Sequence, residues 1–566
     1  MTTDFAAIND ALSALSGNDA LTAAVRSTLV KALHDAPPAT QTENGAHALS
    51  LSGMVTNRDA KVLDLWGSII AANMQAVRGS STSLAASLPL LSLIHDLVAR
   101  AEFYRFIAYQ RDISDGKGER DITYMFLYEA YSMGYGAEVK LLLKLLPTVG
   151  YGYWGDLVNF YNYINSRGDS DDSDRARDMK SWILKTLMHQ ARHDEMLLTT
   201  TKSSISLVGK WLPSENKKKD NESHIAKDLA AIMFPGKGSL ARYRQLLTKL
   251  RRHLKVVECS MSSNEWGEID PSATPAKAMK KYRKVFMNPK GSEDAGRVLL
   301  AEKLTALFSG KTDKTIKTKG LQFYELIKTY VDGGVLDEVI EAQAKTIIKD
   351  LQVSVRNGGF PISVALCDVS GSMSGIPMIV SIALGLLVAN IMPAPWGGRV
   401  ITFESTPRWV SLPLTSSICT QVRVLKEAPW GGSTNFTAAV DLVLQEALKN
   451  KSVPAPKFLF VFTDMQFDAA AEDNRSFVVD VLKAKFARHE LVMPKMVLWN
   501  LRASGTCSFA ADKNTPGVAM LSGFSQSAFK VFTSGCNFED MSPTSLLMEA
   551  LHSSRYDAAA ACVVTV

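Results

Sequence analysis

The C-terminal third of the chain alternates short apolar runs with helical stretches, and this alternation limits the possible folds more than any other feature. The runs rich in Val, Ile, Leu and Phe are residues 361–368, 398–405, 457–464 and 494–502. The helical stretches between them are residues 376–391, 435–449 and 474–489. Strands that alternate with helices form a parallel sheet with helices on both faces. We therefore predict a doubly wound α/β domain over residues 358–566.

The preceding part of the chain has a different pattern. Residues 1–57 are polar and rich in small residues, which predicts an N-terminal helix followed by a loose linker. From residue 58 to residue 357, apolar residues recur at helical spacing and strand-like alternation is scarce. Several short helices joined by brief loops indicate a helical-repeat, HEAT-like layer. The expected fold is thus an all-helical region followed by an α/β domain.

Composition and cysteine usage restrict the class of protein. The 566 residues are 46% hydrophobic and 21% charged, which is typical of a globular chain. The six cysteines are scattered without a CxxC pair, so we expect a reducing compartment. The first residues lack a basic, apolar leader, and the apolar segment 376–392 is short for a membrane span and follows a strand directly. We expect an intracellular, cytoplasmic protein that has no membrane partner and in which segment 376–392 is a buried helix.

Oxygen-bearing side chains gather in three loops of the predicted α/β domain. They are Asp368, Ser370 and Ser372 in the first loop, Ser433, Thr434 and Thr437 in the second, and Thr463 and Asp464 in the third. Sites of open α/β sheets form beyond the carboxyl ends of the strands. Two carboxylates with several hydroxyls suit a hard divalent cation such as Mg²⁺, with Mn²⁺ or Ca²⁺ as alternatives. The sequence therefore predicts a metal site there, although a plain Ser/Gly turn is the alternative reading of "DVSGS".

With these loops in this order, residues 358–566 resemble a von Willebrand factor A domain, a Rossmann-like fold with a metal-ion-dependent adhesion site (MIDAS). The resemblance implies Ser370 and Ser372 as direct ligands, Asp368 and Asp464 acting largely through water, and Thr434 as the ligand from the second loop. It also implies that a protein partner supplies a carboxylate to the metal.

The chain departs from that family's pattern in two places. The second loop reads Gly-Gly-Ser-Thr where the family often has Gly-Gly-Thr, so Ser433 and Thr437 remain alternatives to Thr434. The third loop reads Thr-Asp-Met where the family favours Thr-Asp-Gly.

Positive charge is concentrated in the middle of the chain. Residues 240–320 carry 18 Lys and Arg against 8 Asp and Glu, whereas the whole chain has a net charge of +6. A block of this kind often binds a polyanion, and a solvated helical face is the alternative.

The helical region contains "RDISDGKGER", with Gly116-Lys117-Gly118 between two predicted helices. Together with the following A-type domain, it resembles the TROVE-plus-A-domain layout of Ro ribonucleoproteins. It is more closely similar to a family of the same layout found mostly in plants, fungi and large viruses. The Ro resemblance implies that the helical region binds structured or single-stranded RNA.

The candidate nucleic-acid contacts are Arg242, Arg244, Lys249, Arg251, Arg252, Lys255, Lys280, Lys281, Arg283, Lys284, Lys117 and Arg120. Alternatively, Arg111, Lys117 and Arg120 form salt bridges between helices. Tyr243 and Tyr282 either stack on bases or belong to the core.

No catalytic set of residues appears at a readable spacing, so we expect a non-enzymatic binding protein. The first hypothesis combines a metal site for partner binding with RNA bound by the basic helical region. The alternative is a protein–protein interaction scaffold without nucleic acid, in which the A-type domain holds an acidic partner through the metal.

Overall fold

The computed structural model describes most of the chain from residue 90 onward. The described residues are 40–41, 47–48, 65, 68–69, 72–73, 90–167, 174–200, 204–217, 219–221, 223–287, 293–309, 313–356, 360–368, 370–403, 406–428, 436–464, 475–502, 517–533 and 543–563. Within the predicted linker they form two short antiparallel strands that the sequence did not predict, β1 (Thr40–Gln41) and β2 (His47–Ala48). The predicted N-terminal helix lies outside the described residues.

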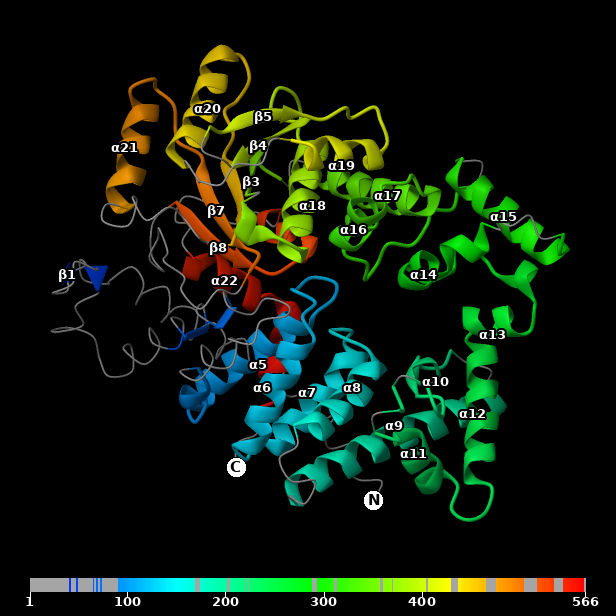
Figure 1. The fold of residues 1–566 in the computed structure, drawn as a ribbon. Coiled ribbons are helices and arrows are strands. Elements are labelled where there is room, and N and C mark those ends of the chain that lie inside the picture. Colours follow the sequence, from blue (N-terminus) through cyan, green and yellow to red (C-terminus); the bar gives the residue numbers. More distant parts are fainter. Residues whose placement is uncertain are drawn as a thin grey trace.

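The region up to residue 356 is helical, as the apolar spacing predicts. Its helices are α5 (Leu97–Arg111), α6 (Asp121–Ser132), α7 (Gly136–Thr148), α8 (Trp154–Ser166), α9 (Asp174–Thr200), α10 (Val208–Trp211), α11 (Ile225–Met233), α12 (Ser239–His253), α13 (Val257–Ser262), α14 (Ala276–Phe286), α15 (Ala295–Phe308), α16 (Phe323–Gly333) and α17 (Glu338–Arg356). They follow an arc that leaves the sheet at α5 and returns to it through α16 and α17 (Figure 1).

A six-stranded sheet forms the C-terminal part. The strands are β3 (Ser363–Asp368), β4 (Arg399–Phe403), β5 (Arg408–Ser411), β6 (Phe458–Thr463), β7 (Lys495–Asn500) and β8 (Val518–Ser522). Their order is β5-β4-β3-β6-β7-β8, and every pair is parallel except β4 with β5. The four predicted apolar runs became β3, β4, β6 and β7, whereas the two edge strands were not predicted.

Helices cover both faces of the sheet (Figure 1). They are α18 (Ile376–Ile391), α19 (Ile418–Lys426), α20 (Phe436–Lys449), α21 (Arg475–Ala487) and α22 (Pro543–Leu551). The predicted buried helix is confirmed as α18, which is buried along most of its length. Among the described helices, none has the length and apolar character needed to cross a membrane.

The helical region and the α/β domain meet near residue 357, but they do not have separate hydrophobic cores. Buried residues of α16 and α17, such as Leu326 and Ile347, share one core with α18 and with one face of the sheet. The opposite face packs against α20 and α21, and that core continues into the helices from α5 to α12. The two regions therefore enclose their apolar surface jointly.

Polar contacts fasten the C-terminal segment to α5. The guanidinium of Arg555 forms a bidentate ion pair with the fully buried Asp112 carboxylate, one bond of which measures 2.9 Å from Nη2 to Oδ1. Tyr556 donates its hydroxyl to the same carboxylate at 3.1 Å. Arg105 of α5 contacts Asp557 at 2.7 Å. Since a buried carboxylate requires compensation, these contacts hold the C-terminal segment against α5.

Candidate metal site and basic groove

Asp368 and Thr463 end the two central strands and lie side by side. Asp368 is the last residue of β3 and Thr463 is the last residue of the neighbouring parallel strand β6. The Thr463 hydroxyl donates to Asp368 Oδ2 at 2.7 Å, and both side chains are buried. Thr463 therefore fixes the orientation of the carboxylate. The sequence places Thr463 in the third loop, but its partner becomes evident only from the register of the strands.

The first loop brings its two serines together. The backbone N–H of Ser370 donates to Asp368 Oδ1 at 3.0 Å, and the Ser370 and Ser372 hydroxyl oxygens lie 2.9 Å apart. Both serines are only half-buried, so this part of the site faces solvent. Arg502, which follows β7, donates from its guanidinium to the Ser372 carbonyl. This contact was not predicted, because Arg502 carries no motif that links it to the first loop.

The electrostatics of the site are governed by the burial of its two aspartates. Burial is the main influence on the Asp368 carboxyl and raises its pKa, and the negative charge of the buried Asp464 raises it further. Hydrogen bonds from Ser370 and Thr463 act in the opposite direction and favour the charged form. Two buried carboxylates beside two half-exposed hydroxyls are hard oxygen donors that fit a divalent cation, because its charge would offset their repulsion.

Of the three second-loop candidates, the structure describes Thr437 alone. Ser433 and Thr434 lie outside the described residues, and Thr437 is half-buried in the first turn of α20. Within the described ranges, no group of three or more His, Cys, Asp and Glu side chains is placed to hold a metal ion. The candidate site therefore depends on its hydroxyls as well as on its two aspartates.

A row of buried polar residues continues from Asp368 across the ends of the strands. The strand register places Thr463 beside Asn500 and Asn500 beside Ser522. All are at most 4% exposed. At the far end of the row, Lys117 from the helical region donates from Nζ to Ser522 Oγ at 2.6 Å and to the Asn73 carbonyl at 2.9 Å. The candidate metal loop and the helical region thus adjoin the same polar row.

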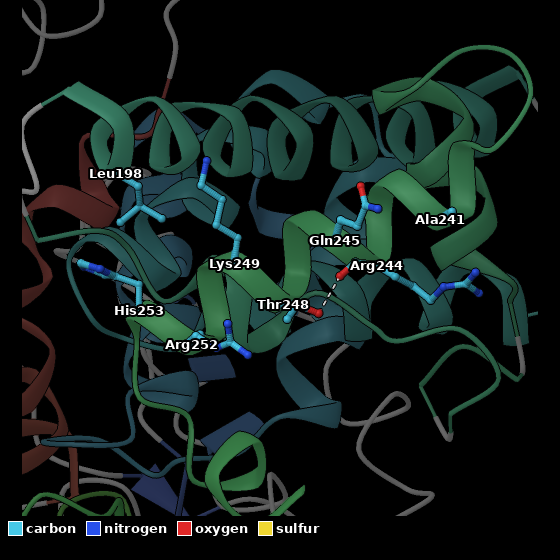
Figure 2. A pocket seen from close by; sticks show the side chains of 8 residues that line it. All are labelled: Leu198, Ala241, Arg244, Gln245, Thr248, Lys249, Arg252 and His253. Atoms are coloured by element: carbon cyan, nitrogen blue, oxygen red, sulfur yellow. Dashed lines mark hydrogen bonds between the residues drawn. The ribbon is translucent and has the colours of Figure 1, made fainter. Parts of the chain in front are cut away.

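The predicted basic cluster forms part of a groove between α9 and α12 (Figure 2). The groove has a volume of about 920 Å³ and is lined by Leu198, Ala241, Arg244, Gln245, Thr248, Lys249, Arg252 and His253. Arg252 is exposed, Arg244 contacts Glu215 at 2.7 Å, and Lys249 lies 3.8 Å from Glu195. Exposed ion pairs of this kind contribute little to stability and exchange readily for a phosphate.

Three other predicted arginines are committed to structural contacts. Arg251 donates to the carbonyls of Gly209 and Leu212 at 3.0 and 2.7 Å, and so ties α12 to α10. Arg242 donates to carbonyls at the end of α11, including that of Pro235 at 2.9 Å. Arg283 contacts Asp337 at 2.7 Å. These contacts make the three arginines poor candidates for phosphate binding.

The remaining predicted residues differ in exposure. Lys255, Lys281 and Lys284 are exposed, whereas Lys280 is half-buried and burial lowers its pKa. The question left open for the tyrosines is answered for Tyr243, which is fully buried and donates to the Pro213 carbonyl at 2.8 Å. The half-buried Tyr282 contacts Glu258 and Lys281.

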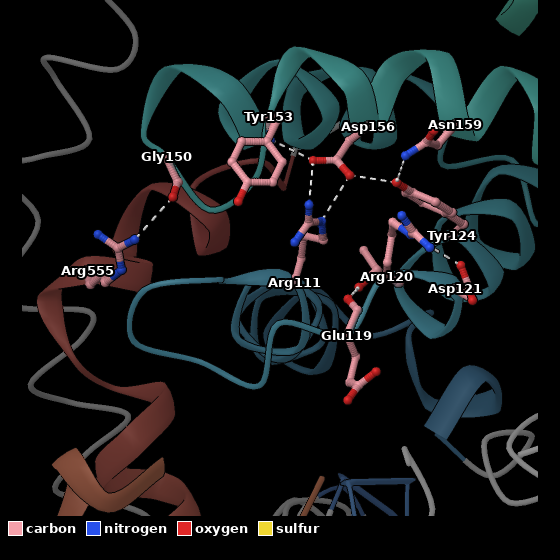
Figure 3. Close-up of polar contacts among 11 residues, drawn as sticks. Arg111, Glu119, Arg120, Asp121, Tyr124, Gly150, Tyr153, Asp156, Asn159 and Arg555 are labelled. Carbon is pink, nitrogen blue, oxygen red and sulfur yellow. Dashed lines mark hydrogen bonds and ion pairs between the residues drawn. The ribbon is translucent and has the colours of Figure 1, made fainter. Parts of the chain in front are cut away.

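The "RDISDGKGER" segment is largely structural (Figure 3). Arg111 forms a buried bidentate ion pair with Asp156 at 3.0 and 2.9 Å, which confirms the salt-bridge reading for this residue. Lys117 is only 2% exposed, so its inclusion among the nucleic-acid contacts was wrong for the folded state. Arg120 is exposed and lies 3.5 Å from Asp121, which leaves it accessible to an anion.

Comparisons with known proteins agree with the two-part layout. Residues 174–353 match the family model described as "Domain of unknown function (DUF2828)", and residues 362–558 match "Domain of unknown function (DUF7788)". The chain is similar to "Uncharacterized protein L728" of Acanthamoeba polyphaga mimivirus, with 34% identity over 455 residues, which cover 78% of this chain and 77% of the viral protein. On this evidence, the chain belongs to the same family as the mimivirus protein L728, and within this chain a DUF2828 match precedes a DUF7788 match.

Proposed function

We propose that this chain is a non-enzymatic binding protein with two separate binding regions. The α/β domain is of the von Willebrand factor A type, and its MIDAS holds Mg²⁺, Mn²⁺ or Ca²⁺ through the site around Asp368, with Thr434 as the second-loop ligand. A protein partner supplies a carboxylate to that metal. The helical region binds RNA along the groove between α9 and α12.

The juxtaposition of Asp368, Ser370, Ser372 and Asp464 at the ends of β3 and β6 carries the metal proposal. The aspartates are buried while the serines border solvent, so a ligand atom from a partner can approach from the serine side. A divalent cation held by mostly uncharged hydroxyls supplies an electrophilic centre for an anionic oxygen. Thr463 keeps the Asp368 carboxylate oriented for this role.

Isothermal titration with Mg²⁺ and Mn²⁺ tests the metal site. We expect wild type to bind one ion per chain and Ser372→Ala to bind at least about tenfold more weakly, since each bond to a charged group contributes about 1.5–3 kcal/mol. Ser374→Ala is the matched control, because Ser374 lies in the same loop and is exposed. Equal binding by both variants, or no binding by wild type, contradicts the proposal.

The groove between α9 and α12 supports RNA binding, because Arg244, Lys249 and Arg252 lie along one side of it (Figure 2). Contacts with phosphates would give an affinity that falls steeply with salt and does not depend on sequence.

The test is to recover nuclease-protected RNA from the natively purified protein, for wild type and for a triple Ala variant of these three residues. RNA protected by wild type alone supports this part of the proposal. RNA binding is contradicted if neither protein carries RNA. If chelating the metal then releases a bound protein partner, the chain acts as a protein–protein interaction scaffold instead.

A further inference from the structure

An arginine that the metal proposal does not use lies beside the first loop of the candidate metal site. Arg502 is the second residue after β7, and its side chain is exposed. Its guanidinium donates to the backbone carbonyl of Ser372. The hydroxyl of the same serine lies 2.9 Å from that of Ser370, and both are proposed metal ligands. The structure therefore places a permanent positive charge next to a residue that carries one of the two hydroxyls.

The backbone that carries Arg502 is held by buried contacts. Its N–H donates to Asn500 Oδ1 at 3.0 Å, and the N–H of Leu501 donates to the Thr463 carbonyl at 2.9 Å. Asn500, Leu501 and Thr463 are all fully buried. Because Asn500 lies beside Thr463 in the strand register, this segment belongs to the polar row that begins at Asp368. The backbone of the arginine is thus fixed, whereas its guanidinium reaches solvent.

The guanidinium has more donors than its contact with Ser372 uses. A guanidinium carries five N–H groups in a planar fork. In the described part of the chain, the side chain of Arg502 contacts the Ser372 carbonyl and forms no ion pair with a carboxylate. An ion pair with a carboxylate is stronger than a hydrogen bond to a neutral carbonyl. The arginine can therefore bind an anionic group that approaches the site from the serine side.

The charges around the two serine hydroxyls differ between the interior and the surface. Asp368 and Asp464 are buried, whereas Arg502 is exposed. The two aspartates alone would repel an incoming carboxylate, and a positive group at the surface opposes that repulsion. Charges of complementary sign select one class of partner and suppress others. The arginine thus gives the exposed side of the site the sign that an acidic partner requires.

We propose that Arg502 determines the specificity of this site by pairing with the carboxylate that a protein partner brings to the metal. This inference rests on the metal site of the proposed function. A guanidinium matches the two oxygens of a carboxylate, so it selects an Asp or Glu side chain over a neutral Asn or Gln. It acts on the partner rather than on the metal, because it contacts Ser372 through the backbone carbonyl and not through the hydroxyl.

The test uses full-length protein loaded with Mn²⁺ and two capped peptides, acetyl-Gly-Glu-Gly-amide and acetyl-Gly-Gln-Gly-amide. The glutamate side chain is the sole carboxylate of the first peptide, and the second peptide has none. Isothermal titration measures Mn²⁺ binding. Water-proton relaxation measures peptide binding, because the relaxation rate falls when a carboxylate displaces water from the bound Mn²⁺.

Two variants and one control are compared with wild type. Arg502→Gln removes the charge, and Arg502→Lys keeps the charge without the planar fork. Arg488→Gln is the control, because Arg488 is exposed and lies between α21 and β7, at the edge of the sheet where the parallel strands begin. Urea denaturation establishes that each variant is folded.

We expect wild type to bind the glutamate peptide and not the glutamine peptide. Arg502→Gln should bind Mn²⁺ at least as tightly as wild type does, because a neighbouring positive charge is lost. It should bind the glutamate peptide about tenfold or more weakly, since a bond to a charged group is worth about a factor of ten. Arg502→Lys should have an intermediate affinity for the peptide, and the control should match wild type.

The outcomes separate this inference from the metal proposal. Equal affinity of wild type and Arg502→Gln for the glutamate peptide would overturn the role of Arg502 and leave the metal site intact. Weaker Mn²⁺ binding by Arg502→Gln would also overturn it, because the arginine would then support the first loop instead. If wild type binds Mn²⁺ but not the glutamate peptide, capture of a carboxylate is refuted. If wild type binds no Mn²⁺, the metal proposal fails and this inference fails with it.

Discussion

Replacing Lys117 by methionine should remove a pH dependence of stability that originates at the junction of the two regions. Burial lowers the pKa of Lys117 to about 7, with Glu119 acting weakly in the opposite direction. In the unfolded chain a lysine has a pKa of about 10.4. Between these values the unfolded state binds more protons than the folded state, so the free energy of unfolding rises with pH.

For one group with these pKa values, linkage gives an increase of about 2 kcal/mol in the free energy of unfolding from about pH 6 to about pH 8.5. The methionine variant lacks this contribution, so its stability should rise by that much less over the same range. The Ser522 hydroxyl and both Asn73 oxygens keep a hydrogen bond in the variant, because Ser522 still donates to the Asn73 carbonyl and Gln110 still donates to Asn73 Oδ1.

Urea denaturation followed by circular dichroism at several pH values measures this difference. Lys227→Met is the control, because Lys227 is exposed and its change should leave the pH profile of wild type intact. Parallel profiles for wild type and Lys117→Met would refute the reasoning, since they would mean that the Lys117 ammonium group is solvated in the folded protein.

Three further predictions concern the site, the groove and the junction. Thr463→Val should weaken Mg²⁺ binding and lower the free energy of unfolding by about 1–3 kcal/mol, because it removes the hydroxyl that donates to the buried Asp368 carboxylate. Thr463→Ser keeps that hydroxyl, so titration should show unchanged Mg²⁺ binding and urea denaturation should show unchanged stability. Arg251→Ala should lower the free energy of unfolding by about 2 kcal/mol, whereas Arg252→Ala should leave stability unchanged and weaken binding of an RNA oligonucleotide at low salt. Arg555→Ala should destabilise the fold by about 3–5 kcal/mol in calorimetry, because it leaves the buried Asp112 carboxylate without its cationic partner, and a melting temperature equal to that of wild type would contradict this.

The sequence by itself determined the order of the elements and the position of the candidate metal site. Apolar runs of strand length alternate with helical stretches after residue 360, and this periodicity survives in β3, β6 and β7. Asp368 and Asp464 each follow such a run. Because parallel strands place their carboxyl ends at one edge of the sheet, sequence order alone is enough to predict that the two aspartates meet.

The edge strands escaped prediction for a physical reason. β5 (Arg408–Ser411) is four residues long, polar at both ends and only partly buried, so its sequence carries little apolar signal. It owes its strand conformation to pairing with β4 rather than to its own propensity.

Only the tertiary structure decided which cations remain available for a ligand. Arg251 and Arg252 are adjacent in the sequence, but successive residues point about 100° apart around a helix, so one reaches the carbonyls of α10 and the other reaches solvent. Lys117 and Ser522 are 405 positions apart, yet their hydrogen bond buries the lysine. Charge and spacing are local properties of the chain, whereas burial depends on partners that only the folded chain brings into contact.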